Sequence, residues 1–102
     1  MGEPVTVATV DELAPGEGMA VVVDGEAVAL FNVDGEFHAI ANACTHVGGS
    51  LGNGRLSVTV VRCPLHGATF DVTTGEVLSL PADEPVRRYP VEVRGDEVRV
   101  VR

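Results

Sequence analysis

The 102-residue chain is long enough for one domain with a modest core and too short to add a catalytic domain. Fifteen acidic residues against seven arginines and no lysine give a net charge of -8, which argues against binding to nucleic acid or to an anionic membrane surface. No apolar run approaches the roughly 18 to 20 residues of a membrane-spanning helix and the N-terminus lacks a signal-peptide layout, so we expect a cytoplasmic protein.

Short strands separated by turn residues are expected in the first half of the chain. Residues 3–10 read as an edge strand that pairs with the C-terminus, and residues 11–13 as at most one helical turn. Asp24-Gly25 and Asp34-Gly35 are strong hairpin signals, because glycine adopts positive φ freely and aspartate tolerates it. They separate three runs rich in β-branched and apolar residues and so predict a three-stranded meander: 19–23, 27–33 and 37–42.

The second half of the chain continues in the same way. Residues 57–62 are expected to form one strand that ends at Cys63, and residues 68–72 and 76–78 a small hairpin. Residues 89–94 and 97–102 predict a terminal hairpin around Gly95-Asp96, because valines alternate with charged residues on both sides. Since no segment shows a helical period over ten residues, we expect residues 1–102 to form one all-β domain, a sandwich or partial barrel.

Two short motifs carry the candidate chemistry. Cys44-Thr45-His46 and Cys63-Pro64-Leu65-His66 contain both cysteines of the chain, each two or three residues before a histidine. Four such donors at the ends of strands could hold a structural zinc ion or an iron-sulfur cluster. Glycines follow both motifs, where backbone amides could point at sulfide ions, and this favours a cluster over zinc: Gly48, Gly49, Gly52, Gly54 and Gly67.

The two motifs and their surroundings resemble those of Rieske 2Fe-2S proteins. The likeness rests on Cys44-Thr45-His46-x-Gly48, on the run from Cys63 to Asp71, on Thr74-Gly75 and on Pro81-Ala82. It implies that Cys44 and Cys63 bind one iron and that His46 and His66 bind the other, as ligands of one 2Fe-2S cluster. It also implies a Rieske-like base domain that carries a small cluster-binding subdomain at about residues 43–80.

Four positions differ from the high-potential respiratory members of that family. Gly49 and Leu65 stand where those members have a further disulfide, so that disulfide is impossible here. Ala68 and Phe70 stand where those members place hydroxyl groups near a sulfide and near a ligand thiolate. Because hydrogen bonds to the cluster raise its reduction potential, the resemblance implies a low-potential member.

Apolar residues next to the motifs are expected to limit access of water and to offer a docking patch. They are Val47, Leu51, Pro64 and Leu65. Leu80-Pro81-Ala82 resembles the proline-containing loop that covers the cluster in the family. His38, alone in the middle of an expected strand, is assigned no function.

The family resemblance implies a soluble electron-transfer protein without catalytic residues of its own. We expect a monomeric ferredoxin that takes single electrons from a flavin-dependent NAD(P)H reductase and passes them to a terminal ring-hydroxylating oxygenase. A small Rieske subunit of assimilatory nitrite reductase is an alternative with the same cofactor. A zinc-stabilised interaction module without redox activity is an alternative of a different class.

Overall fold

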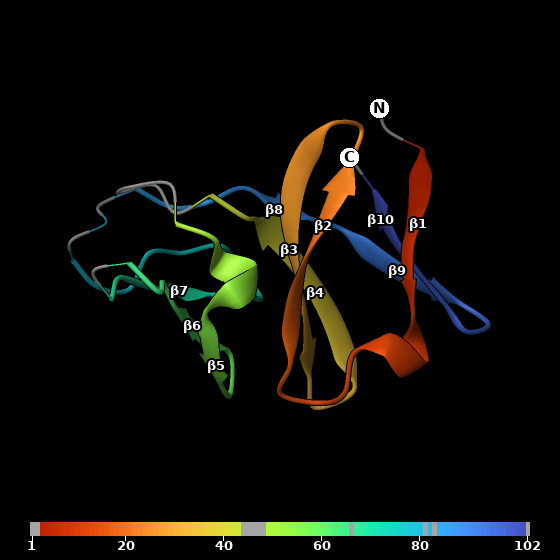
Figure 1. Cartoon of the computed structure of the whole chain (residues 1–102), viewed down its shortest axis with the longest axis horizontal. Helices are drawn as coiled ribbons and strands as arrows, with labels where there is room; N and C mark the ends of the chain where they lie inside the picture. The colour runs from red at the N-terminus through yellow and green to blue at the C-terminus, as the bar shows by residue number, and fades with distance from the viewer. Residues whose placement is uncertain (1–2, 44–48, 66, 81, 83, 102) are drawn as a thin grey trace.

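The computed structural model describes residues 3–43, 49–65, 67–80, 82 and 84–101, which form three small antiparallel sheets (Figure 1). The first sheet has the order β1-β10-β9, the second β2-β3-β4-β8 and the third β5-β6-β7. The elements in chain order are β1 (Pro4–Thr9), η1 (Val10–Glu12), β2 (Gly18–Val23), β3 (Glu26–Val33), β4 (Glu36–Ala41), η2 (Leu51–Asn53), β5 (Arg55–Ser57), β6 (Val60–Arg62), β7 (Thr69–Asp71), β8 (Arg88–Tyr89), β9 (Val91–Arg94) and β10 (Glu97–Val101). In the described part of the chain, no helix is long and apolar enough to cross a membrane.

The β2-β3-β4-β8 sheet lies between the other two sheets, and β3 is buried on both of its faces (Figure 1). Since side chains alternate across a strand, Val28 and Leu30 contribute to one core and Ala29 and Phe31 to the other. The first core lies against the β1-β10-β9 sheet and forms the sandwich. The second core lies against the β5-β6-β7 sheet, which thereby becomes a smaller unit attached to the sandwich. The predicted all-β architecture is confirmed.

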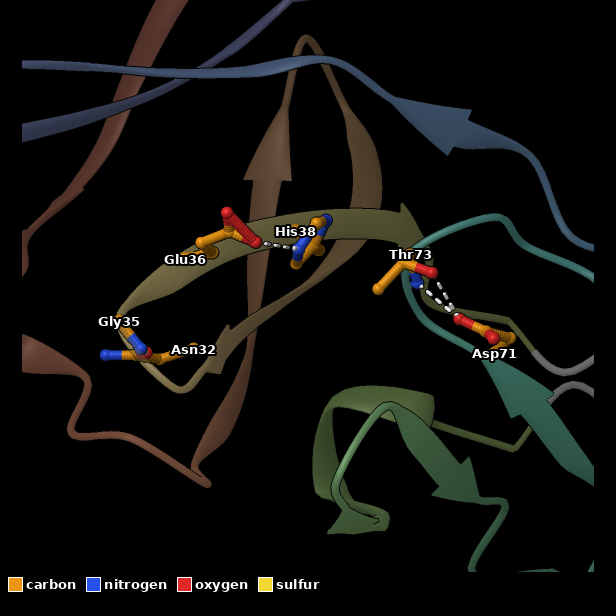
Figure 2. A network of polar contacts seen from close by, with 6 residues as sticks. All are labelled: Asn32, Gly35, Glu36, His38, Asp71 and Thr73. Atoms are coloured by element: carbon orange, nitrogen blue, oxygen red, sulfur yellow. Dashed lines mark hydrogen bonds and ion pairs between the residues drawn. The ribbon is translucent and has the colours of Figure 1, made fainter.

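The predicted meander is present as β2, β3 and β4. The turns Asp24-Gly25 and Asp34-Gly35 have positive φ at both residues, the pattern of a type I′ hairpin. Asn32 reinforces the second turn, because its Oδ1 accepts a hydrogen bond of 2.8 Å from the Gly35 N–H (Figure 2). β4 then leads directly to Asn42 and Ala43, the last described residues before the first ligand motif.

The N-terminal strand pairs with the C-terminal strand, as the sequence predicts. β1 and β10 are antiparallel from Pro4↔Val101 to Thr9↔Glu97, with an irregularity between Thr6 and Ala8. The Thr6 hydroxyl donates a 2.9 Å hydrogen bond to the Glu97 carboxylate, and with the adjacent Arg99 it holds the pKa of Glu97 below its usual value. The predicted helical turn is the 3-10 turn η1, and the terminal hairpin is β9 and β10.

The prediction of one continuous strand over residues 57–62 is wrong. The segment is a tight hairpin in which β5 and β6 pair and Val58 and Thr59 form the turn, with Ser57 opposite Val60. Val58 has a φ of 56° and is 82% exposed. Positive φ at the first turn residue alone is the sign pattern of a type II′ turn, where glycine is the usual residue. A run of β-branched residues without glycine gave no signal for this turn.

The conformation of Val58 predicts that Val58→Gly stabilises the fold. Positive φ costs a β-branched residue about 1 kcal/mol or more, and the exposed side chain contributes little packing in return. We expect the free energy of unfolding to rise by about 1 kcal/mol, or about 4 to 8 °C in Tm, in thermal unfolding followed by circular dichroism.

Val22→Gly is the matched control. Val22 is also an exposed valine, at 68%, but it lies inside β2, where glycine lowers stability. Destabilisation by both substitutions would contradict the assignment of strain to Val58.

Candidate metal centre

The described residues on the two sides of the first ligand motif are bonded to one another. Ala43 and Ser50 form an isolated antiparallel bridge, and the Leu51 N–H donates a 2.8 Å hydrogen bond to the Asn42 carbonyl. The Asn42 side chain adds a 2.7 Å bond from the Gly52 N–H to its Oδ1. The described residues that flank the first motif, Ala43 and Ser50, are therefore held side by side between β4 and η2.

The second motif begins where β6 ends. Cys63 directly follows Arg62, its side chain is 1% exposed, and its N–H donates a 2.7 Å hydrogen bond to the Ala68 carbonyl. That bond holds Cys63 beside Ala68, and β7 begins at Thr69. β6 and β7 pair as neighbours, so the residues on both sides of the second motif are fixed next to each other.

The two loops meet at Gly49 and Cys63. A Cβ atom added to Gly49 would lie 2.8 Å from the Cys63 Sγ and 3.3 Å from the Leu65 Cβ. A side chain at position 49 would therefore occupy space next to the sulfur atom. Glycine at this position allows the end of the first loop to lie directly against Cys63, the first predicted ligand of the second loop.

One of the four predicted ligands lies among the described residues. Cys63 is buried at the end of β6, whereas Cys44, His46 and His66 lie outside the described residues, although their neighbours Ala43 and Gly67 are described. Among the residues that the structure describes, no group of three or more histidine, cysteine, aspartate or glutamate residues could hold a metal ion.

The side chains around Cys63 are apolar. Cys63, Ala68, Phe70 and Leu51 all belong to the core between the middle sheet and the β5-β6-β7 sheet. Leu51 is fully buried, so the expectation that it forms part of an exposed cap is wrong. Leu51 follows the first motif in the sequence, but η2 turns its side chain into the core.

Exposed leucines provide an apolar surface at the two-loop end of the molecule. Leu65 is 48% exposed and Pro64 is also exposed, as predicted, whereas Val47 lies outside the described residues. Leu78 and Leu80, which are 50% and 78% exposed, are further exposed leucines that the sequence did not single out. The Leu78 N–H donates to the Thr69 carbonyl, which places this segment beside the second loop. The sequence feature that could have indicated them is the pair of leucines shortly before Pro81, the predicted covering proline.

In that predicted covering segment Ala82 is buried, and Pro81 lies outside the described residues. His38 takes no part in the loops, because it lies in β4 with its Nε2 3.8 Å from the Glu36 carboxylate (Figure 2). Asp71, which follows the second loop, accepts hydrogen bonds of 2.8 and 2.6 Å from the N–H and hydroxyl of Thr73. It therefore supports the turn after β7 (Figure 2).

Comparison with known proteins identifies the family of the chain. The profile of the Rieske [2Fe-2S] domain matches residues 3–90. The chain belongs to the Rieske [2Fe-2S] family. The family and the 2Fe-2S cofactor predicted from the sequence are therefore confirmed.

Several of the similar proteins are ferredoxin components of dioxygenase systems. This Rieske chain is 47% identical over 93 residues to the biphenyl dioxygenase ferredoxin subunit of Pseudomonas sp. strain KKS102, covering 90% of this chain and 85% of the relative. The ferredoxin of carbazole 1,9a-dioxygenase from Nocardioides aromaticivorans IC177 superposes with a TM-score of 0.92, at 41% identity and 95% coverage of both chains. A ferredoxin solved in complex with the oxygenase of carbazole 1,9a-dioxygenase has a TM-score of 0.91, at 34% identity, covering 96% of this chain and 92% of that one.

The described residues fit a Rieske cluster. Such a cluster needs two thiolates, two imidazoles and close backbone approach to its sulfur atoms. Cys63 is buried in apolar surroundings, and the space beside its sulfur is kept free of side-chain atoms by Gly49. The disulfide of the high-potential members cannot form here, although a Cβ atom added to Gly49 would lie 3.3 Å from the Leu65 Cβ, close to the separation in a disulfide.

The contact between Gly49 and Cys63 predicts that Gly49→Ala lowers cluster content. The added methyl group must displace either the Cys63 sulfur or the end of the first loop. We expect less than about half the wild-type iron and acid-labile sulfide per chain, measured with the visible absorbance of the purified protein. The loss of cluster is expected to be partial, because hydrogen bonds of about 1 kcal/mol each still hold the ends of the loop.

Gly35→Asn is the control, because a Cβ at Gly35 meets open space and asparagine tolerates positive φ. It should retain the wild-type iron content. Equal iron content in the two variants would contradict the role of the space beside Cys63.

Proposed function

We propose that this Rieske chain is a ferredoxin that carries single electrons from a flavin-dependent reductase to a terminal ring-hydroxylating oxygenase. The observation that supports it best is the likeness over nearly the whole chain to ferredoxin components of dioxygenase systems, one of them solved with an oxygenase. The chain itself is not an enzyme in this proposal. We also keep the expectations that it acts as a monomer and in the cytoplasm.

We propose Cys44, Cys63, His46 and His66 as the cluster ligands, two cysteines for one iron and two histidines for the other. When bound, the cluster supplies reversible one-electron transfer. The chain's own residues bind it, keep water away from Cys63 and fix the separation of the two loops. Each histidine follows its cysteine by two or three residues in the sequence, and we propose the histidine side of the cluster as the point of contact with a partner.

The exposed leucines are the proposed docking surface. Leu65, Leu78 and Leu80 lie on the second loop and on the segment bonded beside it. Single exposed apolar side chains are common on protein surfaces, but a cluster of them at one end of a molecule is typical of a contact site. Electron transfer over a short distance requires a partner to contact this end of the molecule, and apolar contacts permit rapid release afterwards.

We further propose a reduction potential near the low end of the Rieske range. Ala68 and Phe70 are fully buried in the second loop and in β7, and neither can donate a hydrogen bond from its side chain. A hydrogen bond to a charged acceptor contributes about 1.5 to 3 kcal/mol, or roughly 65 to 130 mV for one electron. Two missing donors therefore account for up to about 130 to 260 mV of the roughly 450 mV range.

Electron transfer in a reconstituted system tests the function. Purified chain is combined with a flavin-dependent ferredoxin reductase and the terminal oxygenase of a dioxygenase system, and substrate turnover is measured against ferredoxin concentration. We expect a brown protein that supports turnover, and Leu80→Ser to raise its apparent KM about fivefold, the loss of about 1 kcal/mol at a docking contact.

Val22→Ser, at an exposed position on β2, is the matched control and should leave the KM unchanged. A colourless protein that binds zinc would support the non-redox alternative. Turnover only with a nitrite reductase catalytic subunit would support the second redox alternative.

The potential is tested by a spectroelectrochemical titration of the purified protein. We expect a midpoint below about +100 mV, within the range of roughly -150 to +300 mV known for such centres. Ala68→Ser should raise the midpoint, by at most about 65 to 130 mV, because it restores a donor near the cluster.

Thr69→Ala is the control, since the Thr69 hydroxyl contacts the Ser79 hydroxyl at 2.7 Å and removing it should leave the midpoint unchanged. A wild-type midpoint well above +100 mV would overturn the low-potential assignment.

A further inference from the structure

Asn42 is one of two buried polar side chains among the described residues, and it lies two positions before Cys44. We propose that Asn42 is a positioning residue that holds the first ligand loop against the second. The inference rests on the ligand set proposed above. The sequence alone indicates no role for this residue, although asparagine commonly bonds to nearby backbone groups in loops.

The Asn42 side chain joins both ends of the first loop. Its Oδ1 accepts hydrogen bonds from the Gly52 N–H at 2.7 Å and from the Ser50 hydroxyl at 3.2 Å, and its Nδ2 lies 3.0 Å from the Ser50 Oγ. Its backbone N–H donates to the Ala27 carbonyl at 3.2 Å, and its carbonyl accepts from Leu51. One residue therefore links the first loop to β3 and to η2.

The position of the loop end depends on these bonds. Gly49 lies against the Cys63 sulfur, and the next residue, Ser50, is bonded to Asn42. Gly52 packs against the backbone of β2, where an added Cβ would lie 2.7 Å from the Ala20 nitrogen. Two consecutive glycines at positions 48 and 49 supply little stiffness of their own. Without Asn42, the buried Gly52 N–H loses its acceptor and the loop can open locally while the rest of the fold persists.

Asn32 offers a comparison within the same molecule. It is 4% exposed, its Oδ1 accepts from the Gly35 N–H at 2.8 Å and its Nδ2 donates to the Leu13 carbonyl at 2.8 Å. Asn32 and Asn42 therefore close loops by the same kinds of bond. Figure 2 shows Asn32 at the turn where β4 begins, whereas Asn42 follows the end of β4. Six residues of strand, about 20 Å, separate the two ends.

The experiment compares Asn42→Ala with Asn32→Ala in the cluster-loaded protein. The rate of iron transfer to a strong ferrous chelator is measured under conditions where both variants are folded, together with Tm and the EPR spectrum of the reduced protein. We expect Asn42→Ala to release iron at least about tenfold faster than wild type, because a buried donor is left unsatisfied. Asn32→Ala should lower Tm by a similar amount and change the release rate less than about twofold. Only Asn42→Ala should broaden the EPR signal.

Ser50→Ala is the milder variant, which serves if Asn42→Ala does not fold. It removes the bonds to Ser50 and keeps the bond from Gly52, so release should accelerate between about twofold and tenfold. The double variant should release iron no faster than Asn42→Ala, because Ser50 acts through Asn42.

Equal release rates in Asn42→Ala and Asn32→Ala, or wild-type release in Ser50→Ala, would overturn the role of Asn42 and leave the ligand set intact. A wild-type protein that binds no iron would overturn the ligand set as well.

Discussion

The whole fold depends on the burial of β3 on both faces. Four consecutive residues, Val28 to Phe31, are fully buried, and they alternate between the sandwich core and the core beneath the ligand loops. A strand covered on one face would leave alternate residues exposed to water. Because the same strand belongs to both cores, the sandwich and the smaller sheet cannot shift independently. The cluster-binding part is thereby held by packing and not by a linker.

Close approach between backbones completes that attachment. Gly18 accommodates the Phe31 ring, since a Cβ at position 18 would lie 2.5 Å from it. Gly52 allows η2 to pack on the backbone of β2 in the same region. Gly18 makes room for a side chain of the middle sheet itself, and Gly52 makes room for contact between that sheet and η2. The two glycines are therefore required by packing within the middle sheet and by the packing of η2 against it.

Local signals predicted much of the fold, and tertiary contacts explain the errors. The Asp-Gly turns were predictable because two adjacent residues suffice to determine a tight hairpin. The turn at Val58 carries no such residues, and the pairing of β5 with β6 imposes it on a valine. The burial of Leu51 likewise depends on residues distant in the sequence, and the Asn42 side chain bonds to residues on the far side of the first loop. For the site, the family and its cofactor were recognisable from the residue types and spacing of the two motifs, whereas the leucine surface required knowing which segments lie side by side.

The pairing of β1 with β10 has a consequence for how the chain folds. It joins the two ends of the sequence, with Pro4 opposite Val101, whereas the β5-β6-β7 sheet lies within residues 55–71. Pairings between distant residues form slowly, because a long loop must be closed first. The small sheet that bears the second ligand loop can therefore form early, while the sandwich is completed only after the last strand has joined. A chain in synthesis thus presents Cys63 on local structure before its base is closed.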